Sequence, residues 1–290
     1  MKIQWDERHG KILSCFLEQL SNNGIRWFIL RGYEGLPNAN PSKDVDIMVE
    51  VGQEKKACKL LKEAFSKFGL KYFYSVTYGH AHCYLGMELA TQFSIHIDLI
   101  EGYISKGYEV FTFDELYQHV IPYNGMNVLD DLMNGIMLLV YKIFGYHHAK
   151  LKHAYQADIF KAQQEYPEEF HDILLKIAGD GLGIKLNDLI AQKDFNAVVA
   201  LEPEFTKALK RYTFKIRPWS TIRYSAEFLW QKVSRIIFNY KKYAKTFAVM
   251  APDGTGKTTF LEALLKELNF YYVNDENDNR FHVYHFRPSI

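Results

Sequence analysis

Residues 44–49 alternate acidic and apolar side chains, and this alternation constrains the fold more than any other feature of the chain. Val45, Ile47 and Val49 occupy every second position, and Asp44, Asp46 and Met48 occupy the others. Successive side chains of a β-strand point to opposite faces, so the apolar residues would enter a core and the aspartates would project together. Two carboxylates about 7 Å apart on one strand repel each other unless a cation lies between them. The segment therefore predicts a strand that carries a cation site.

A third carboxylate lies on a later segment with the same alternation. In residues 95–100, His96 and Asp98 share one face, and the apolar residues share the other. If this strand neighbours residues 44–49, Asp98 meets Asp44 and Asp46. Such a trio suits two Mg²⁺ ions that clamp a nucleoside triphosphate, one activating the attacking oxygen and the other stabilising the leaving pyrophosphate. Taken alone, Asp-x-Asp is also typical of a solvated strand edge.

The rest of the chain reads as alternating elements followed by a long helical region. Apolar residues at helical spacing over residues 12–20 end at an Asn-Asn-Gly stop and lead into an apolar strand over residues 25–30. A loop rich in Gly, Pro and Asn covers residues 31–43, a helix is predicted over 53–68, and strands are predicted over 78–85 and 93–100. Residues 129–212 have a helical pattern with breaks near Pro167, near residues 179–183 and at Pro203. We therefore expect an α/β fold with a mixed sheet that is complete by residue 101.

The first hundred residues resemble the active-site pattern of the nucleotidyltransferase superfamily that includes DNA polymerase β. That pattern has an apolar strand, a glycine turn, a loop, Asp-x-Asp, and a third acidic residue on a later strand. Here the turn is Leu30-Arg31-Gly32-Tyr33, the Asp-x-Asp lies at residues 44–46, and the later strand contains His-Ile-Asp at residues 96–98. Tyr33 departs from the pattern, which usually has a second small residue there, although its backbone N–H remains available to a phosphate.

The resemblance implies roles for these residues. Asp44 and Asp46 would bind both metals, and Asp98 would bind the catalytic metal and help to activate the acceptor. The turn would approach the nucleotide phosphates through Arg31, Gly32 and Tyr33.

A second pattern lies near the end of the chain. Residues 246–250 form a short apolar stretch, residues 251–259 read Ala-Pro-Asp-Gly-Thr-Gly-Lys-Thr-Thr, and apolar residues then recur at helical spacing. Strand, Gly-rich loop, Gly-Lys-Thr and helix follow the order of a phosphate-binding loop, in which backbone N–H groups at a helix N-terminus cradle phosphates. Lys257 would reach the β and γ phosphates and Thr258 would bind Mg²⁺, while the first glycine of the motif is replaced by Ala251. The alternative is a fortuitous Gly-rich turn.

This segment resembles the start of thymidylate kinases and related nucleoside monophosphate kinases. Residues 282–286 read as the next strand and are followed by Arg287-Pro288, near where thymidylate kinases place an arginine. The resemblance implies a nucleotide-binding set formed by Asp253, Gly254, Thr255, Gly256, Lys257, Thr258 and Thr259. The 33 residues after Lys257 are too few for a kinase sheet covered on both faces, so we expect an incomplete kinase and the front part of a longer protein.

Together the two resemblances are similar to bacterial fusions of a nucleotidyltransferase-like domain with a thymidylate-kinase-like domain. They imply transfer of a nucleotidyl group from ATP or another NTP to an unknown acceptor, with Mg²⁺ or Mn²⁺ as cofactor. The alternative is a thymidylate-type kinase whose N-terminal domain is a non-catalytic nucleotide-binding module. A third interpretation, a scaffold that associates with membranes, depends on the basic segment described next.

Charge and pattern divide the chain into four predicted parts: residues 1–128, a helical region at 129–214, a connector helix at 215–245, and the kinase-like segment at 246–290. The connector has eight basic residues against Glu227 alone, a net charge of +7. Ile222, Ala226, Leu229 and Val233 form an apolar stripe on it. Such a helix can lie on an anionic membrane or follow a nucleic-acid backbone, but it more often packs its stripe on a neighbouring domain.

Composition excludes several classes of protein. The net charge of the chain is only +1, so we expect no stable complex with nucleic acid, and 48% apolar residues supply ample material for a core. Three cysteines without a Cys-x-x-Cys pair argue against a disulfide framework and indicate a reducing compartment. The first residues lack an apolar signal segment, and the apolar run at 136–141 is far shorter than the roughly 20 residues that span a bilayer. We expect a cytoplasmic protein.

Histidines near the third aspartate raise the alternative of a zinc site. His80 and His82 share a strand face and could join His96 or Asp98 as ligands. Their spacing fits no closed zinc motif, which favours a polar strand face beside the active cleft.

Overall fold

The computed structural model describes residues 5–40, 44–75, 81–88, 90–91, 93–141, 143, 153–234, 237, 256 and 258–264. The chain divides into two compact units, one formed by residues 4–237 and the other by residues 1–3 and 238–290. The fold described below belongs to the first unit. The predicted strands at 246–250 and 282–286 lie outside the described residues, as do Asp253, Gly254, Thr255 and Lys257.

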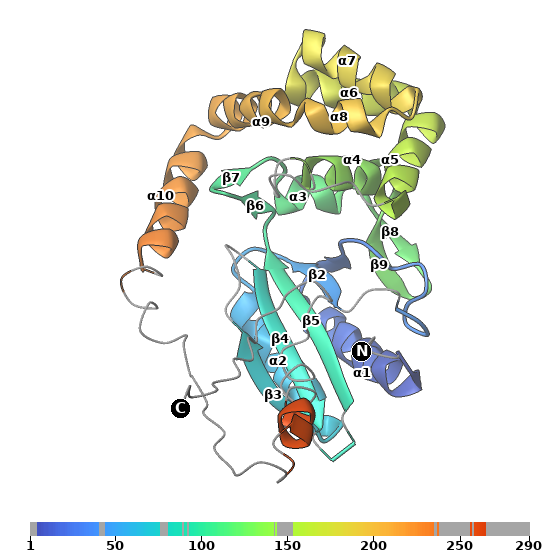
Figure 1. Cartoon of the computed structure of the whole chain (residues 1–290), viewed down its shortest axis with the longest axis vertical. Coiled ribbons are helices and arrows are strands. Elements are labelled where there is room, and N and C mark those ends of the chain that lie inside the picture. The colour runs from blue at the N-terminus through green and yellow to red at the C-terminus, as the bar shows by residue number, and fades with distance from the viewer. Residues whose placement is uncertain are drawn as a thin grey trace, which may run out of the picture. The chain divides into compact units, whose positions relative to one another are not determined.

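A mixed sheet of seven strands forms the centre of the first unit, in the order β3-β4-β5-β2-β1-β9-β8. Figure 1 shows β3, β4 and β5 side by side in this sheet. Strand β2 runs parallel to β5, and β1 runs parallel to β9, whereas the other neighbouring strands are antiparallel. The predicted α/β class with a mixed sheet is therefore confirmed. The strands are β1 (Trp27–Ile29), β2 (Val45–Val49), β3 (Lys71–Ser75), β4 (Ala81–Glu88), β5 (Phe93–Glu101), β8 (Val120–Tyr123) and β9 (Met126–Leu129).

The prediction that the sheet is complete by residue 101 is wrong. Strands β8 and β9 follow it and extend the sheet beyond β1. They are joined by Asn124 and Gly125, both with positive φ (48° and 76°), which is the backbone of a tight hairpin turn. An Asn-Gly pair between two short apolar segments is the sequence signal for this hairpin. The predicted strand at 78–85 is also shifted, since β4 covers Ala81–Glu88.

Two helices, α1 (Glu7–Asn22) and α2 (Glu54–Lys67), supply the core against one face of the sheet. Their apolar stripes pack with the inward side chains of β2 and β5, including Val45, Ile47 and Ile97. A second core lies against Phe28 and Met48, which point to the other face of the sheet. Strand β2 is therefore buried on both faces, and its position is fixed by packing against both cores.

Helices dominate the chain after β9. The predicted breaks are present: α5 ends before Tyr166, α6 ends just before Gly179, and α9 begins next to Pro203. These helices are α4 (Asp131–Val140), α5 (His153–Glu165), α6 (Pro167–Ala178), α7 (Asp180–Ala191), α8 (Phe195–Ala200), α9 (Glu202–Ile216) and α10 (Pro218–Ser234). Between β5 and β8 lie the small hairpin β6 (Ile104–Ser105) and β7 (Tyr108–Glu109) and the short helix α3 (Phe113–Tyr117). Among the described residues, no helix is both long and apolar enough to cross a membrane.

The predicted connector at 215–245 is not one continuous helix over its described part. Helix α9 ends at Ile216 and α10 begins at Pro218, with Arg217 between them. The Arg217 guanidinium donates to the backbone carbonyls of Glu109 (3.2 Å) and Val110 (3.0 Å) and forms an ion pair with Glu115. This arginine fastens the helix junction to the β7–α3 segment, so its charge is not part of a free basic surface.

Helix α10 contacts the rest of the unit through a polar face. The buried Thr221 hydroxyl donates to the Thr213 carbonyl at 3.5 Å, and Ser225 lies against the β6–β7 turn. Ile222 (50%) and Leu229 (62%) of the predicted stripe are exposed, as are Trp219 (82%) and Trp230 (64%). In the described part of the chain, the predicted packing of this apolar stripe on a neighbouring domain is therefore not seen.

The His119–Asp130 pair predicts a pH-dependent contribution to stability. His119 Nδ1 lies 2.8 Å from Asp130 Oδ2, and Asp130 also caps α4 by accepting from the Met133 backbone N–H. The hydrogen bond with Asp130 raises the pKa of His119 despite partial burial. Because the protonated form is the stabilised one, the contribution is complete below the ordinary histidine pKa of about 6.5 and is lost as pH rises through the raised value.

We expect His119→Gln to lower the free energy of unfolding more at about pH 5.5 than at about pH 9, by less than about 1 kcal/mol, since the pair is partly exposed. Urea denaturation at both pH values measures this difference. An equal loss at both would contradict the pairing.

Candidate active site

Three carboxylates converge on one face of the sheet. Asp46 on β2 and Asp98 on β5 are direct partners in the parallel register, and Asp44 precedes β2 by one residue. One carboxylate oxygen from each of Asp44, Asp46 and Asp98 lies within 4.8 Å of the other two. The structure therefore confirms the predicted convergence of these three side chains. Asp46 is buried, and the other two are half-buried.

Local packing explains why the aspartates face this way. Val45, Ile47 and Val49 enter the core formed with α1 and α2, so alternation turns Asp44 and Asp46 to the opposite face. Met48 follows on that opposite face and joins the second core. On this face of β2, Met48 is part of the second core, whereas Asp44 and Asp46 are polar. The carboxylates therefore lie at the edge of that core.

Arg31 forms an ion pair with one of the aspartates. Its Nε donates to Asp46 Oδ2 at 2.6 Å, and its guanidinium carbon lies 4.6 Å from the centre of the Tyr141 ring. The side chains of Arg31 and Asp46 are 19% and 9% exposed, so the pair is largely withdrawn from water. Arg31, predicted to bind the nucleotide, thus pairs with Asp46, a predicted metal ligand. This bond uses Oδ2 of Asp46 and leaves Oδ1 for a further ligand.

Burial and like charges shape the protonation of the group. Burial raises the pKa of Asp46, the charges of Asp44 and Asp98 add to that increase, and Arg31 opposes it without cancelling it. Burial alone would lower the pKa of Arg31, but Asp46 raises it above its ordinary value, so the guanidinium stays charged. Three carboxylates against one guanidinium leave a negative excess that a divalent cation would relieve.

The Gly32 turn has room for a ligand. Gly32 adopts φ +64°, a left-handed conformation that favours glycine, and apart from its two chain neighbours no described residue has an atom within 4 Å of where its Cβ would be. Tyr33 is buried, its hydroxyl donates to the Leu129 carbonyl at 3.3 Å, and its ring lies against Tyr123 at 5.3 Å between centres. The unusual tyrosine therefore fixes the turn to β9 and the β8–β9 hairpin, and its side chain does not fill the turn.

Two more side chains extend the carboxylate group. His96 Nε2 lies 2.9 Å from Asp98 Oδ1, and Cys83 is the direct antiparallel partner of Asp98 on β4. Burial lowers the pKa of His96, but Asp98 and the two other aspartates raise it above its usual value. Sequence reasoning considered His80 and His82 and missed Cys83, because only the β4–β5 register shows which β4 residue faces Asp98. His82 is one position off that register, and His80 lies outside the described residues.

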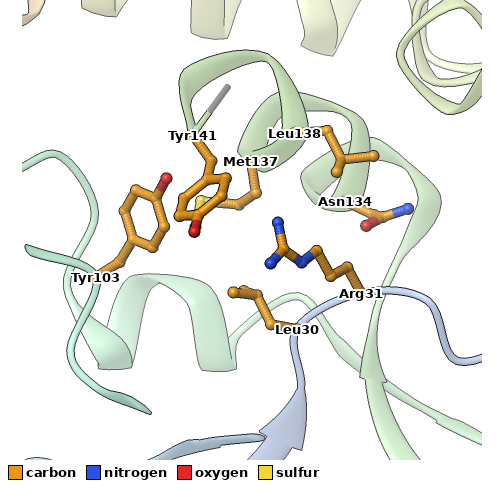
Figure 2. Close-up of a pocket in the computed structure, with 7 residues that line it drawn as sticks. All are labelled: Leu30, Arg31, Tyr103, Asn134, Met137, Leu138 and Tyr141. Carbon is orange, nitrogen blue, oxygen red and sulfur yellow. The ribbon is translucent and has the colours of Figure 1, made fainter. Parts of the chain in front are cut away.

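A small cavity lies beside Arg31 (Figure 2). Its volume is about 10 Å³, and it is lined by Leu30, Arg31, Tyr103, Asn134, Met137, Leu138 and Tyr141. Arg31 Nη1 and Asn134 Oδ1 are buried without a hydrogen-bond partner among the described residues. A cavity of this size with two polar atoms holds about one water molecule, so it is not a nucleotide site.

Only three residues of the predicted phosphate-binding loop are described. Gly256 has φ +81°, and Thr258 and Thr259 open a helix over residues 258–264. The Phe260 N–H donates to the Gly256 carbonyl at 2.9 Å. Gly256 thus lies two residues before the described part of this helix, Lys257 is outside the described residues, and the phosphate-binding role of the loop stays a prediction.

Comparison with protein-family models gives no match, and comparison with curated proteins gives none. Two of the similar solved structures come from Helicobacter pylori. One is a candidate nucleotidyltransferase, 13% identical with a TM-score of 0.38, and the match covers 72% of this chain and 95% of that one. The other is the protein JHP933, 11% identical with a TM-score of 0.37, and the match covers 80% of this chain and 96% of that one. The functional interpretation of the site rests on its geometry.

Proposed function

We propose that this chain is a metal-dependent nucleotidyltransferase that transfers a nucleotidyl group from a nucleoside triphosphate to an acceptor hydroxyl. The observation that carries the proposal is the convergence of Asp44, Asp46 and Asp98 from the adjacent parallel strands β2 and β5. Their oxygens form the hard, anionic ligand set that Mg²⁺ and Mn²⁺ prefer. When bound, such ions activate the attacking oxygen and neutralise charge on the leaving pyrophosphate.

In the proposed reaction, the acceptor oxygen attacks the α-phosphorus, the bond from that phosphorus to the α–β bridging oxygen breaks, and pyrophosphate leaves. Asp98 would take up the acceptor proton, since it is less buried than Asp46 and its Oδ1 has no hydrogen-bond partner among the described residues. Arg31 would be a positioning residue that holds Asp46 in one orientation. The Gly32 turn would supply backbone N–H groups to the phosphates.

We further propose that residues 253–259 bind ATP. This proposal is supported by the order of strand, Gly-rich loop and Gly-Lys-Thr in the sequence, and by the turn at Gly256 next to a helix. Lys257 is the only positively charged side chain in that loop.

Pyrophosphate release tests the two nucleotide sites separately. The unmodified chain should release pyrophosphate from at least one NTP in the presence of Mg²⁺ or Mn²⁺ and a suitable sugar or protein acceptor. The Lys257→Ala variant should keep this release and bind ATP more weakly at the C-terminal loop, because the loop loses its positive charge.

Two outcomes would contradict this division of roles. Saturable NTP binding without pyrophosphate release for any acceptor would favour a non-catalytic nucleotide-binding module. Loss of release in Lys257→Ala would assign the chemistry to the C-terminal loop.

A further inference from the structure

Asp98 belongs to a second group of potential metal ligands besides the three carboxylates. Cys83 lies directly across from it on β4, and His96 lies two residues before it on β5. One ligand atom from each of Cys83, His96 and Asp98 lies within 4.8 Å of the other two. The two groups are thus neighbours on one sheet face and share the Asp98 side chain.

The strands fix this second group as firmly as the first. Strands β4 and β5 pair in a continuous antiparallel register in which Cys83 is opposite Asp98. The pairs on either side, His82 with Leu99 and Tyr84 with Ile97, keep the same register. Alternation along β5 puts His96 on the same face as Asp98. All three side chains are half-buried, and Asp98 Oδ1 is buried without a hydrogen-bond partner among the described residues.

The donor atoms of the two groups differ in kind. Asp44, Asp46 and Asp98 offer only carboxylate oxygens, which suit Mg²⁺. A thiolate sulfur, an imidazole nitrogen and a carboxylate oxygen are typical ligands of Zn²⁺, and three protein ligands leave a fourth position for water or another ligand. We propose that Cys83, His96 and Asp98 form a Zn²⁺-class site that is separate from the carboxylate group except for the shared Asp98. This proposal is independent of the proposed nucleotidyl transfer, because the three residues could bind Zn²⁺ whether or not the chain catalyses that reaction.

A hydrogen-bonded network without metal is the competing explanation. His96 Nε2 already lies 2.9 Å from Asp98 Oδ1, an oxygen that is buried and has no hydrogen-bond partner among the described residues. In such a network, serine could replace Cys83 as a hydroxyl donor, whereas a metal site loses its only sulfur ligand. The Cys83→Ser variant therefore separates the two explanations.

Co²⁺ is the probe, because it takes the place of Zn²⁺ and absorbs light. The full chain, stripped of metal with a chelator, should develop a sulfur-to-cobalt charge-transfer band in the near ultraviolet when Co²⁺ is added, and Zn²⁺ should remove it. Cys83→Ser should lack the band. The matched controls Cys15→Ser and Cys58→Ser should keep it, since those thiols lie on α1 and α2. His96→Gln should weaken Co²⁺ binding at least about tenfold.

Absence of the band in the unmodified chain, or its survival in Cys83→Ser, would overturn this proposal. Asp46→Asn should keep the band, because Asp46 does not belong to the sulfur-containing group. A chain that binds Mn²⁺ but shows no charge-transfer band would refute the zinc-class site alone. A chain that shows the band but never releases pyrophosphate would refute the proposed nucleotidyl transfer alone.

Discussion

Replacing Arg31 with methionine is expected to lower the free energy of unfolding by about 3–5 kcal/mol, the range observed when one partner of a buried ion pair is removed. Asp46 would stay buried beside Asp44 and Asp98 without the guanidinium 2.6 Å away, and it would have to remain charged without a partner or take up a proton. Methionine keeps much of the side-chain length, so the lost charge accounts for most of the effect. Urea denaturation in the presence of a chelator measures it.

A divalent cation should partly restore the stability of this variant. Mn²⁺ bound to the three carboxylates would supply the missing positive charge, and a ligand that binds only the folded state raises its stability. The gain in melting temperature with Mn²⁺ should therefore be larger for Arg31→Met than for the unmodified chain.

Arg26→Met is a matched control, because Arg26 forms ion pairs with Glu50 and Asp114 at the surface. It should lose far less stability and gain nothing extra from Mn²⁺. Equal losses in the two variants would show that Arg31 does not compensate a buried charge.

The Asp46→Asn substitution is expected to reduce pyrophosphate release by a factor on the order of 10²–10³, as for removal of one preorganised electrostatic group. The amide keeps the shape of the side chain and can still accept from Arg31, but it lacks the charge that holds a metal. Asp188→Asn on the exposed surface of α7 is the control and should leave release unchanged.

Since Asp46 is buried against Arg31, the folded fraction of the variant must be measured by circular dichroism. Asp44→Asn is a second variant for the same role, because Asp44 is only half-buried and precedes the strand. Release that is unchanged in both variants would refute the proposed role of the carboxylates.

The shared face of the carboxylates could be predicted because the side-chain period of a strand is a property of the backbone. Once residues 44–49 and 95–100 are strands, alternation alone puts Asp44 with Asp46 and His96 with Asp98. The alternation could not predict that the two strands are neighbours. The structure shows that they are, as the parallel pair β2–β5.

The partners of the aspartates could not be predicted, because they come from strand order. Arg31 meets Asp46 since β1 pairs with β2, and Cys83 meets Asp98 since β4 pairs with β5 in one particular register. A shift of that register by one residue would put His82 in place of Cys83. Local sequence contains no information on such long-range pairing.

Two other features show how tertiary contacts override local patterns. Strand β9 pairs with β1 through one parallel residue pair, Ile29 with Val128. The hydrophobic pattern of a four-residue strand is too short to predict this pairing. Helix α10 has the apolar stripe expected of a helix that packs on a core, yet Ile222 and Leu229 of that stripe are exposed, while Thr221 is buried and its hydroxyl donates to the Thr213 carbonyl. Its orientation follows from the anchor at Arg217, which sets how the helix leaves α9.

Mn²⁺ binding is the most direct test of the central claim that Asp44, Asp46 and Asp98 form a divalent cation site. Titration of the metal-free chain, followed by electron paramagnetic resonance of free Mn²⁺, should show saturable binding that an added NTP strengthens. Asp46→Asn and Asp44→Asn should each weaken this binding at least about tenfold, and Asp188→Asn should not change it. Mn²⁺ affinity that is the same in all four proteins would contradict the account.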